Sequence, residues 1–286
     1  MGAGSSPDLR VEELAGRAYV SVDTIRFYQK RRLLPPPQRR GRVEILAINR
    51  PEARNAVNAD VAQGIEAALD DVEADDDVWA VVVTGRGPVF SAGADLKAVA
   101  AGRGLELMTK RGGFGGITQR AFPKPLIAAV NGPALAGGFE IVLSCDLVVA
   151  ADDARFGLPE VKRGLFASAG GLVRLPKRVP LALATEVAVT GEPIDAGRAH
   201  ALGLVNRVVP QAKVVDEALA LAALIAENAP VAVRASLRMV RDAGDLSEAD
   251  AWRLNSELAA EVGSTKDAIE GATAFAEKRK PNWTGS

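Results

Sequence analysis

The chain has 286 residues, and its 35 Lys and Arg nearly balance its 36 Asp and Glu, which leaves a formal net charge of −1. A single His and a single Cys exclude an internal disulfide, a structural zinc cluster and any multi-histidine metal site. No apolar run reaches the ~20 residues that a membrane helix needs, and Met1 to Asp8 lack the apolar stretch of a secretory signal, so we expect a cytoplasmic protein whose chemistry falls to carboxylates, backbone amides or a cofactor.

The basic charge of the chain is concentrated at its start. Residues 1–42 carry nine Lys or Arg and four Asp or Glu, a net charge of +5, whereas the remainder sums to −6. Pro35-Pro36-Pro37 ends the basic part, because proline cannot continue a helix and stiffens the chain. This asymmetry predicts an N-terminal arm, residues 1–42, that is distinct from an acidic body.

From Val43 onward, segments with strand patterns alternate with helical ones. Val61, Ile65, Leu69 and Val72 recur at helical spacing and predict an amphipathic helix near 58–74. Apolar runs, of which the last three are typical of strands covered on both faces, predict strands at Val43–Asn49, Val78–Thr84, Leu126–Val130 and Leu147–Ala151. This alternation indicates an α/β fold built on parallel strands.

Beyond about residue 210 the pattern is helical. Helices are predicted near 212–228, 231–242, 247–262 and 265–279. We therefore expect an α/β core at 43–210 and a C-terminal helical subdomain at 211–286. Residues 98–122 are Gly-rich and irregular, which predicts a flexible loop over a site.

Two Gly-rich turns are the first candidates for a functional site. One covers Phe90 to Lys97, and the other covers Asn131 to Glu140 between a strand and a helix that starts near Gly137 or Gly138. Small residues allow a ligand close to the backbone, and the first N–H groups of a helix lack partners within the helix. Such a turn can bind an oxyanion, although this pattern alone is more often structural.

Two carboxylates lie beside these turns in the sequence. Glu140 falls in the first turn of the new helix, and Glu160 follows Pro159 after the next strand. Either one alone would be interpreted as a favourable helix charge or a solvated loop acid. Together with two Gly-rich backbone turns, they indicate a site with an acid, a base and an oxyanion pocket.

Residues 43–286 resemble the crotonase (enoyl-CoA hydratase/isomerase) superfamily along their full length. The matching stretches are INRPEARNAVN (48–58), VVVTGRGPVFSAGADLK (81–97), KPLIAAVNGPALAGGFEIVLSCDLVVAADDARFGLPEVKRGL (124–165), AGGLVRLP (169–176), TGEPIDAGRAHALGLVNRVVP (190–210) and FAEKRKPNW (275–283). The resemblance implies a crotonase (ClpP-like) spiral of ββα units with a C-terminal helical subdomain. Among subgroups, the AGGFE and AGGLVRLP stretches are most similar to carnitinyl-CoA dehydratase-like hydratases.

The resemblance also implies a reaction and its residues. Backbone N–H groups of Ala94 and Gly137 would form the oxyanion hole that stabilises a thioester enolate. Hydratases of the family use two glutamates at the positions of Glu140 and Glu160, and we assign Glu160 as proton donor and Glu140 as the group that activates water. Related isomerases often lack one of the two, so an enoyl-CoA isomerase is the alternative enzyme.

The remaining family roles concern the coenzyme A portion of the substrate. The resemblance places Arg54, Ala92, Ala94, Asp95, Leu96, Lys97 and Gly138 at the CoA-binding surface, and it places Phe275 and Lys278 where C-terminal helices complete a neighbouring subunit's site. It implies a trimer or a dimer of trimers, no metal and no permanently bound cofactor. Met108, Phe114 and Ile117 are candidates for shaping the acyl pocket.

The arm resembles a second family. Residues 9–40 are similar to the start of a MerR-type helix-turn-helix, in which Thr24, Arg26, Tyr28 and Lys30 would face DNA. The wing and the dimerisation helix are missing, and Tyr19 stands where such turns usually have Gly. We favour a gene-fusion remnant or a misassigned start and expect no specific DNA binding. The competing hypothesis is a DNA-binding regulator whose body senses acyl-CoA.

Overall fold

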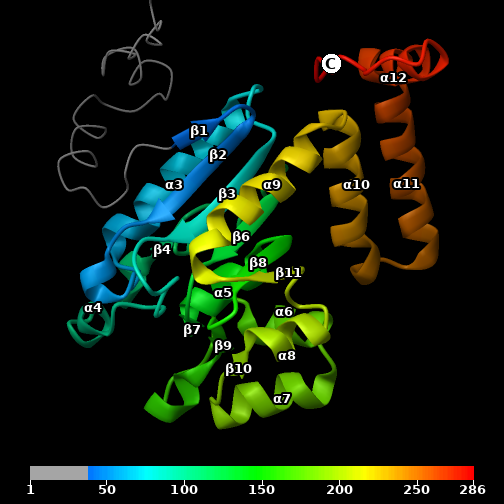
Figure 1. Cartoon of the computed structure of the whole chain (residues 1–286). Coiled ribbons are helices and arrows are strands. Elements are labelled where there is room, and N and C mark those ends of the chain that lie inside the picture. Colours follow the sequence, from blue (N-terminus) through cyan, green and yellow to red (C-terminus); the bar gives the residue numbers. More distant parts are fainter. Residues whose placement is uncertain (1–37) are drawn as a thin grey trace, which may run out of the picture.

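The computed structural model describes residues 38–286, so the helix-turn-helix interpretation of residues 9–40 lies almost entirely outside the described part. The fold is organised around a six-stranded sheet in the order β1-β2-β3-β6-β8-β11 (Figure 1). β1 pairs antiparallel with β2, and the other pairs are parallel. The strands are β1 Gln38–Arg40, β2 Val43–Ile48, β3 Ala80–Gly85, β6 Leu126–Val130, β8 Leu147–Ala151 and β11 Arg207–Val209.

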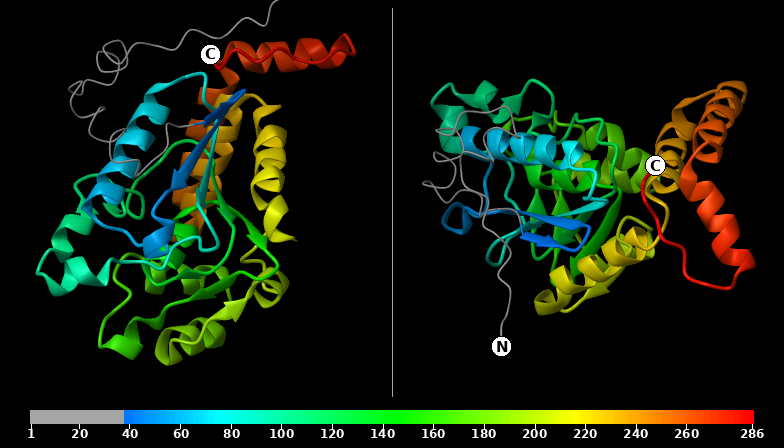
Figure 2. Two further views of the ribbon diagram at one scale, coloured as in Figure 1. Left: turned by 60° about the vertical axis from the view of Figure 1, so that its left-hand side comes forward. Right: turned by 90° about the horizontal axis from the view of Figure 1, so that it is seen from above.

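The central strands form one layer between two helices. Every residue of β2, β3 and β6 is buried, which is what their apolar runs predict for a sheet covered on both faces. α3 (Ala59–Ala74) covers one face and α9 (Val214–Ala226) covers the other, as the view from above shows (Figure 2). The predicted α/β class with parallel strands is confirmed.

α3 shows how the sequence sets these helices. Asn58 caps the helix by accepting the N–H of Val61 at 3.0 Å. The predicted stripe of Val61, Ile65, Leu69 and Val72 is buried against the core, while the opposite face carries charges. The helix is thus positioned by burial of one apolar face, and its polar face remains free for other contacts.

Shorter elements lie between and below the main strands. A second sheet has the order β10-β9-β7, and β4 and β5 form a hairpin. These strands are β4 Met108–Thr109, β5 Gly113–Phe114, β7 Ala134–Leu135, β9 Arg155–Gly157 and β10 Ile194–Asp195. The helices are α4 Leu96–Ala100, α5 Gly137–Ser144, α6 Gly171–Arg178, α7 Leu181–Thr190 and α8 Ala196–Ala201, and the 3-10 turns are η1 Pro51–Ala53, η2 Gly104–Leu107, η3 Pro159–Arg163, η4 Gln211–Lys213 and η5 Ala243–Asp245.

The segment 98–122 is more ordered than its glycine content predicted. It contains η2 and the β4–β5 hairpin, and Phe114 and Ile117 are buried in the main core. Glycines at 113, 115 and 116 have positive φ, so they make the tight turns that let the hairpin pack. The prediction of an irregular loop was therefore wrong for this part of the chain.

The C-terminal region divides in a way that the sequence pattern did not show. α9 packs on the central sheet, whereas α10 (Pro230–Asp242), α11 (Glu248–Gly263) and α12 (Lys266–Ala276) project from the core (Figures 1 and 2). All four predicted helices are present. Within residues 38–286, no single helix is long and apolar enough to cross a membrane, and the one consecutive pair that passes by length and composition, 211–226 with 230–245, is bent by 109°.

Candidate active site

The two Gly-rich turns lie next to each other in the structure. Residues 90–95 run between two other segments of the chain. On one side, Ala92 N–H donates to Arg54 O at 3.0 Å and Val57 N–H donates to Gly93 O at 2.8 Å. On the other side, Leu135 N–H donates to the Ser91 carbonyl at 3.0 Å. The first turn is thereby fixed directly against the second.

This packing aims the Ala94 amide at the second turn. The Gly93 carbonyl points to Val57, and in a trans peptide the following N–H points the opposite way. Gly93 has φ +87°, and a Cβ there would lie 2.7 Å from Gly137 N, so the two amide segments are in contact. Among the described residues, neither the Ala94 nor the Gly137 N–H has a hydrogen-bond acceptor. Two donors are therefore available on one small surface.

Gly137 begins α5, and the neighbouring chain leaves no room for a side chain. It follows Ala136, which has a φ of +52° and donates its N–H to Gly157 O at 2.9 Å. A Cβ at Gly137 would lie 2.4 Å from the Phe114 ring, and one at Gly138 would lie 2.2 Å from Ser91 O. The first N–H of a helix has no partner within the helix and lies at the positive end of its dipole. Unpartnered donors of this kind can bind an oxyanion.

Glu140 points from the first turn of α5 into the protein interior. It is only 3% exposed, and its Oε1 accepts the N–H of Ala169 at 2.7 Å and of Gly171 at 2.9 Å. Burial raises its pKa, whereas these two hydrogen bonds and the nearby Arg174 favour the ionised form. Glu140 is therefore a buried carboxyl held in a defined orientation.

Glu160 has fewer partners. It lies in the first turn of η3 and is partly buried, and its Oε2 is buried without a hydrogen-bond partner among the described residues. Burial raises the pKa of Glu160 to about 7; the charge of Glu140 raises it further, while its own backbone N–H and Arg163 oppose the shift. Near neutral pH, this pair can hold one proton between two carboxyl groups.

The residues predicted to bind CoA cluster around the first turn. Ala92 and Ala94 are partly buried, Arg54, Leu96 and Lys97 are exposed, and Gly138 is buried. The Asp95 carboxylate is already engaged: it accepts the Lys97 N–H at 3.1 Å as the cap of α4 and pairs with Arg50 at 3.1 Å. Within this chain, Asp95 thus holds the turn together.

The other predicted residues separate into two groups. Phe275 is 87% exposed and Lys278 is exposed, and both follow α11 in the projecting region, away from α5 (Figure 1). Phe114 and Ile117 are buried, whereas Met108 is 40% exposed. Of the predicted acyl-pocket residues, Phe114 is the one in contact with the site, through Gly137.

Sequence reasoning missed the residues that hold Glu140. Ala169 and Gly171 belong to the AGGLVRLP stretch that resembles the family, and no role was predicted for them. Both donate their N–H to Glu140. Arg174 donates to Thr118 O at 2.6 Å and to Ala169 O at 3.5 Å. A Cβ at Gly171 would lie 3.1 Å from Glu140 Oε1, so the Gly-Gly pair was the available signal.

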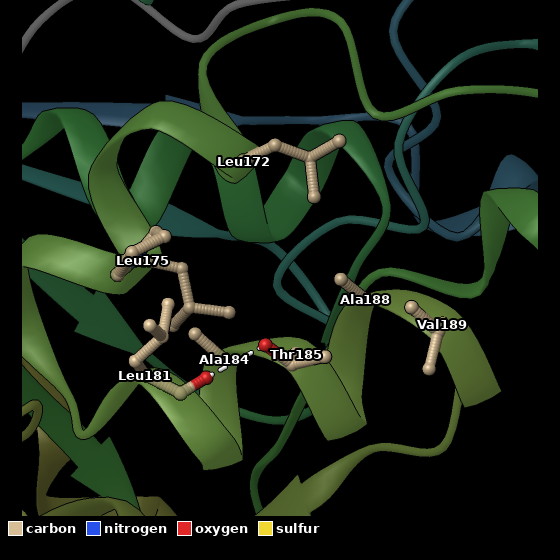
Figure 3. Close-up of a pocket in the computed structure, with 8 residues that line it drawn as sticks. Leu172, Leu175, Leu181, Ala184, Thr185, Ala188 and Val189 are labelled. Atoms are coloured by element: carbon tan, nitrogen blue, oxygen red, sulfur yellow. Dashed lines mark hydrogen bonds between the residues drawn. The ribbon is translucent and has the colours of Figure 1, made fainter.

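Two cavities lie near this region. A cavity of about 440 Å³ adjoins the segment that holds Glu140, and its lining includes Gln119, Ser168, Ala169 and Arg174. A smaller one of about 180 Å³ lies between α6 and α7, lined by apolar side chains and by Thr185, whose hydroxyl donates to Leu181 O at 2.9 Å (Figure 3). Neither lining includes Ala94, Gly137, Glu140 or Glu160, and the lining of the larger cavity also carries the charged side chains of Lys177 and Asp245. Within residues 38–286, no group of three or more His, Cys, Asp or Glu is arranged to hold a metal.

Comparisons with known proteins agree with this geometry. The family model described as enoyl-CoA hydratase/isomerase matches residues 38–286, and the MerR HTH family regulatory protein model matches residues 9–44. The enoyl-CoA hydratase EchA19 of Mycobacterium tuberculosis is 40% identical over 252 residues, which cover 86% of this chain and 94% of that protein. The carnitinyl-CoA dehydratase of Escherichia coli K12 is 40% identical over 253 residues, or 86% of this chain and 97% of that protein. A crystal structure of an enoyl-CoA hydratase from Mycobacterium tuberculosis has a TM-score of 0.85 at 46% identity and covers 89% of this chain and 99% of its own. The chain has the crotonase fold and belongs to the enoyl-CoA hydratase/isomerase family.

Proposed function

We propose that the chain is an enoyl-CoA hydratase, which reversibly adds water across the C2=C3 bond of a 2-enoyl-CoA thioester. The observation that carries the proposal is the pair Glu140 and Glu160: the charge of Glu140 raises the pKa of Glu160, and Glu140 lies in the first turn of the helix that Gly137 begins. Relatives that are 40% identical and are named enoyl-CoA hydratase support it. An enoyl-CoA isomerase needs only one of the two carboxyl groups and is the alternative.

The thioester oxygen would bind between the two turns. Attack of water at C3 moves negative charge onto that oxygen, and the N–H groups of Ala94 and Gly137 would stabilise the resulting enolate. Both donors belong to the main chain and are fixed by packing, so they need no reorganisation during the reaction. The CoA portion would then extend over Ala92, Ala94, Leu96 and Lys97.

The two glutamates would divide the proton transfers. Glu140, ionised with support from Ala169 and Gly171, takes a proton from water as its oxygen bonds to C3. Glu160, protonated because burial raises its pKa to about 7, gives its proton to C2 as the enolate collapses. The product leaves Glu140 protonated and Glu160 ionised, which is the state that starts the reverse dehydration.

The family resemblance also supports a proposal about the location, cofactor requirement and assembly of the protein. We propose a cytoplasmic enzyme with no permanently bound cofactor and with coenzyme A as part of its substrate. We further propose a homotrimer or a dimer of trimers, in which Phe275 and Lys278 reach a neighbouring subunit's CoA site. The exposure of Phe275 outside the core supports this arrangement.

Turnover of crotonyl-CoA, followed by loss of the enoyl-thioester absorbance, tests the reaction. Glu140→Gln and Glu160→Gln should each lower kcat by at least about 10²-fold, because each removes a proton-transfer group. Glu44→Gln is the matched control, since its carboxyl lies in β2 and its pKa is also raised to about 7 by burial. Near wild-type turnover in both site variants would refute the mechanism. A panel of longer and more polar enoyl thioesters, crotonobetainyl-CoA included, then defines the acyl group.

The pH profile provides a second test of the shared proton. The value of kcat/KM should fall as pH rises above about 7, where Glu160 loses its proton. Hydration and dehydration start from the same singly protonated pair, so the two directions should share one profile. Profiles with different alkaline limbs in the two directions would contradict this assignment.

The match of residues 9–44 to the MerR model supports a second candidate function, that of a DNA-binding regulator. A regulator would bind an operator fragment in a salt-dependent way and would lose that binding on deletion of residues 1–40. The regulator would be favoured if the protein bound the operator fragment, if acyl-CoA weakened that binding, and if the protein did not turn over enoyl-CoA.

A further inference from the structure

We propose that Glu66, on α3, is a positioning residue: it fixes the segment 109–120 and through it sets the geometry of both the Gly137 amide and Glu140. This inference rests on the proposed hydratase function, because it assigns a role in that reaction to a residue outside the site. It begins with the contacts that Glu66 makes.

The Glu66 carboxylate receives three hydrogen bonds from one turn of this segment. Its Oε2 accepts the Thr109 hydroxyl, the Arg111 N–H at 3.2 Å and the Gly112 N–H at 2.7 Å. Hydrogen bonds to an ionised acceptor are stronger than neutral ones. Gly116 packs so closely on α3 that a Cβ there would lie 2.2 Å from Ala62 O. The turn is therefore held on the helix both by charge and by close packing.

Two further acids on the same face of α3 hold the ends of the segment. Glu66, Asp70 and Glu73 follow the i, i+4, i+7 spacing of one helix face. Asp70 binds Arg111 and Arg120, each at 2.7 Å, and Glu73 binds the same two at 2.5 and 2.6 Å. The Arg111 side chain is half-exposed, so its ion pairs contribute little individually, whereas the Arg120 side chain is buried against Asp70 and Glu73. Glu66 is the acid of this face whose carboxylate binds the main-chain N–H groups of the turn itself.

From this segment, contacts run to the first half of the site. The Phe114 ring lies against Gly137, where a Cβ would come within 2.4 Å of it. A shift of the hairpin would therefore release or press the residue that carries one oxyanion donor.

A second set of contacts runs to the other half. Thr118 O accepts the Arg174 guanidinium at 2.6 Å, and Arg174 also reaches Ala169 O at 3.5 Å. The Ala169 N–H in turn binds Glu140 at 2.7 Å. The same segment thus supports both the enolate donor and the water-activating carboxylate.

Steady-state kinetics of the full chain on crotonyl-CoA test this role. Glu66→Ala should lower kcat about ten- to a hundred-fold, because small displacements at a reacting centre have costs of that order, while KM changes less. Its pH profile should shift, since Arg174 helps to set the pKa of Glu140. Glu66→Gln keeps one acceptor and should recover part of the loss. Glu106→Gln, in the adjoining η2 and paired with Arg103, is the control.

A double-mutant cycle separates positioning from general stability. If Glu66 acts through Phe114, Glu66→Ala in a Phe114→Leu background should cost clearly less than it does alone. Additive losses would overturn the route through Phe114 to Gly137, and a lower melting temperature with kcat and pH profile unchanged would overturn the whole proposal. An inactive wild type would refute the hydratase function but not the positioning role of Glu66. In that case, hydrogen exchange of the substrate-free protein still tests the positioning role. Glu66→Ala should then speed exchange in 109–120 and at the start of α5, and unchanged exchange there would also overturn it.

Discussion

The α/β core and the projecting helices α10–α12 are held together in different ways. The core buries whole strands in one continuous apolar cluster, whereas the projecting pair α10–α11 has a separate cluster of Ala235, Leu254 and Leu258. On α11, Trp252 is 64% exposed, and on α12, Ile269 is 69% exposed and Phe275 is 87% exposed. The main cluster of the core is thus formed within one chain, while the tail, like Phe166 and Leu181 of the core, carries apolar surface that an assembly could cover.

This contrast suggests different roles for the core and for the projecting helices. In the core, packing is dense enough to hold strained and costly features, such as a carboxyl oxygen without a partner in Glu160 and a positive φ at Ala136. The tail is fixed to the core mainly by polar contacts, such as those of Arg241 with Asp146 and the Phe122 carbonyl and that of Lys177 with Asp245. We therefore expect substitutions in the core to change chemistry and those in the tail to change assembly.

The largest effect should follow removal of an oxyanion donor from the core. Gly137→Pro deletes the N–H and should lower kcat by about 10²–10³-fold or more. Crotonyl-CoA turnover measures the loss, and circular dichroism confirms that the variant is folded. Gly263→Ala in the tail, where a Cβ would contact nothing within 4 Å, should leave turnover unchanged. Activity retained in a folded Gly137→Pro protein would remove Gly137 from the site.

A smaller effect, on the pH dependence of stability, distinguishes the proposed catalytic acid Glu160 from the structural acid Glu44. The pKa values of Glu160 and Glu44 both rise to about 7 in the folded chain, from an ordinary value of 4.5. Between these values the folded state keeps a proton that the unfolded chain releases, so stability falls as pH rises and levels off above about 7. Glu160→Gln and Glu44→Gln should therefore each raise the melting temperature at pH 8 relative to the wild type, by a margin that shrinks toward pH 4. Only Glu160→Gln should lose turnover, and equal turnover in the two variants would show that Glu160 is not catalytic.

The smallest effect on folding should come from the tail. Phe275→Ala removes a side chain that is 87% exposed, so the free energy of unfolding should change by no more than about 0.5 kcal/mol. Light scattering should instead show a lower mass at low protein concentration, and KM for the thioester should rise. An unchanged mass and KM would mean that Phe275 has no part in an interface.

The strands and the paired glutamates could be predicted because their signals are local. Apolar runs mark β3, β6 and β8, and the Gly-rich motifs mark the site. The contacts of Glu66 with the segment 109–120 could not be predicted, because its partners lie 43 to 46 positions away and the sequence shows only an acid on a helix. The assignment of Asp95 to the CoA surface came from the family resemblance. Its cap on Lys97 and its pairing with Arg50, 45 positions away, leave no pattern in the sequence.

The position of α9 has a consequence for how the protein is made. All the core residues assigned to the reaction have been synthesised once the ribosome has reached Arg174. The sheet face that α9 covers nevertheless stays open until Ala226 has left the ribosome. A nascent chain or fragment that stops at residue 210 would contain every core residue assigned to the reaction and still expose an apolar sheet, which favours aggregation. Any minimal active version of this enzyme must therefore run at least through Ala226.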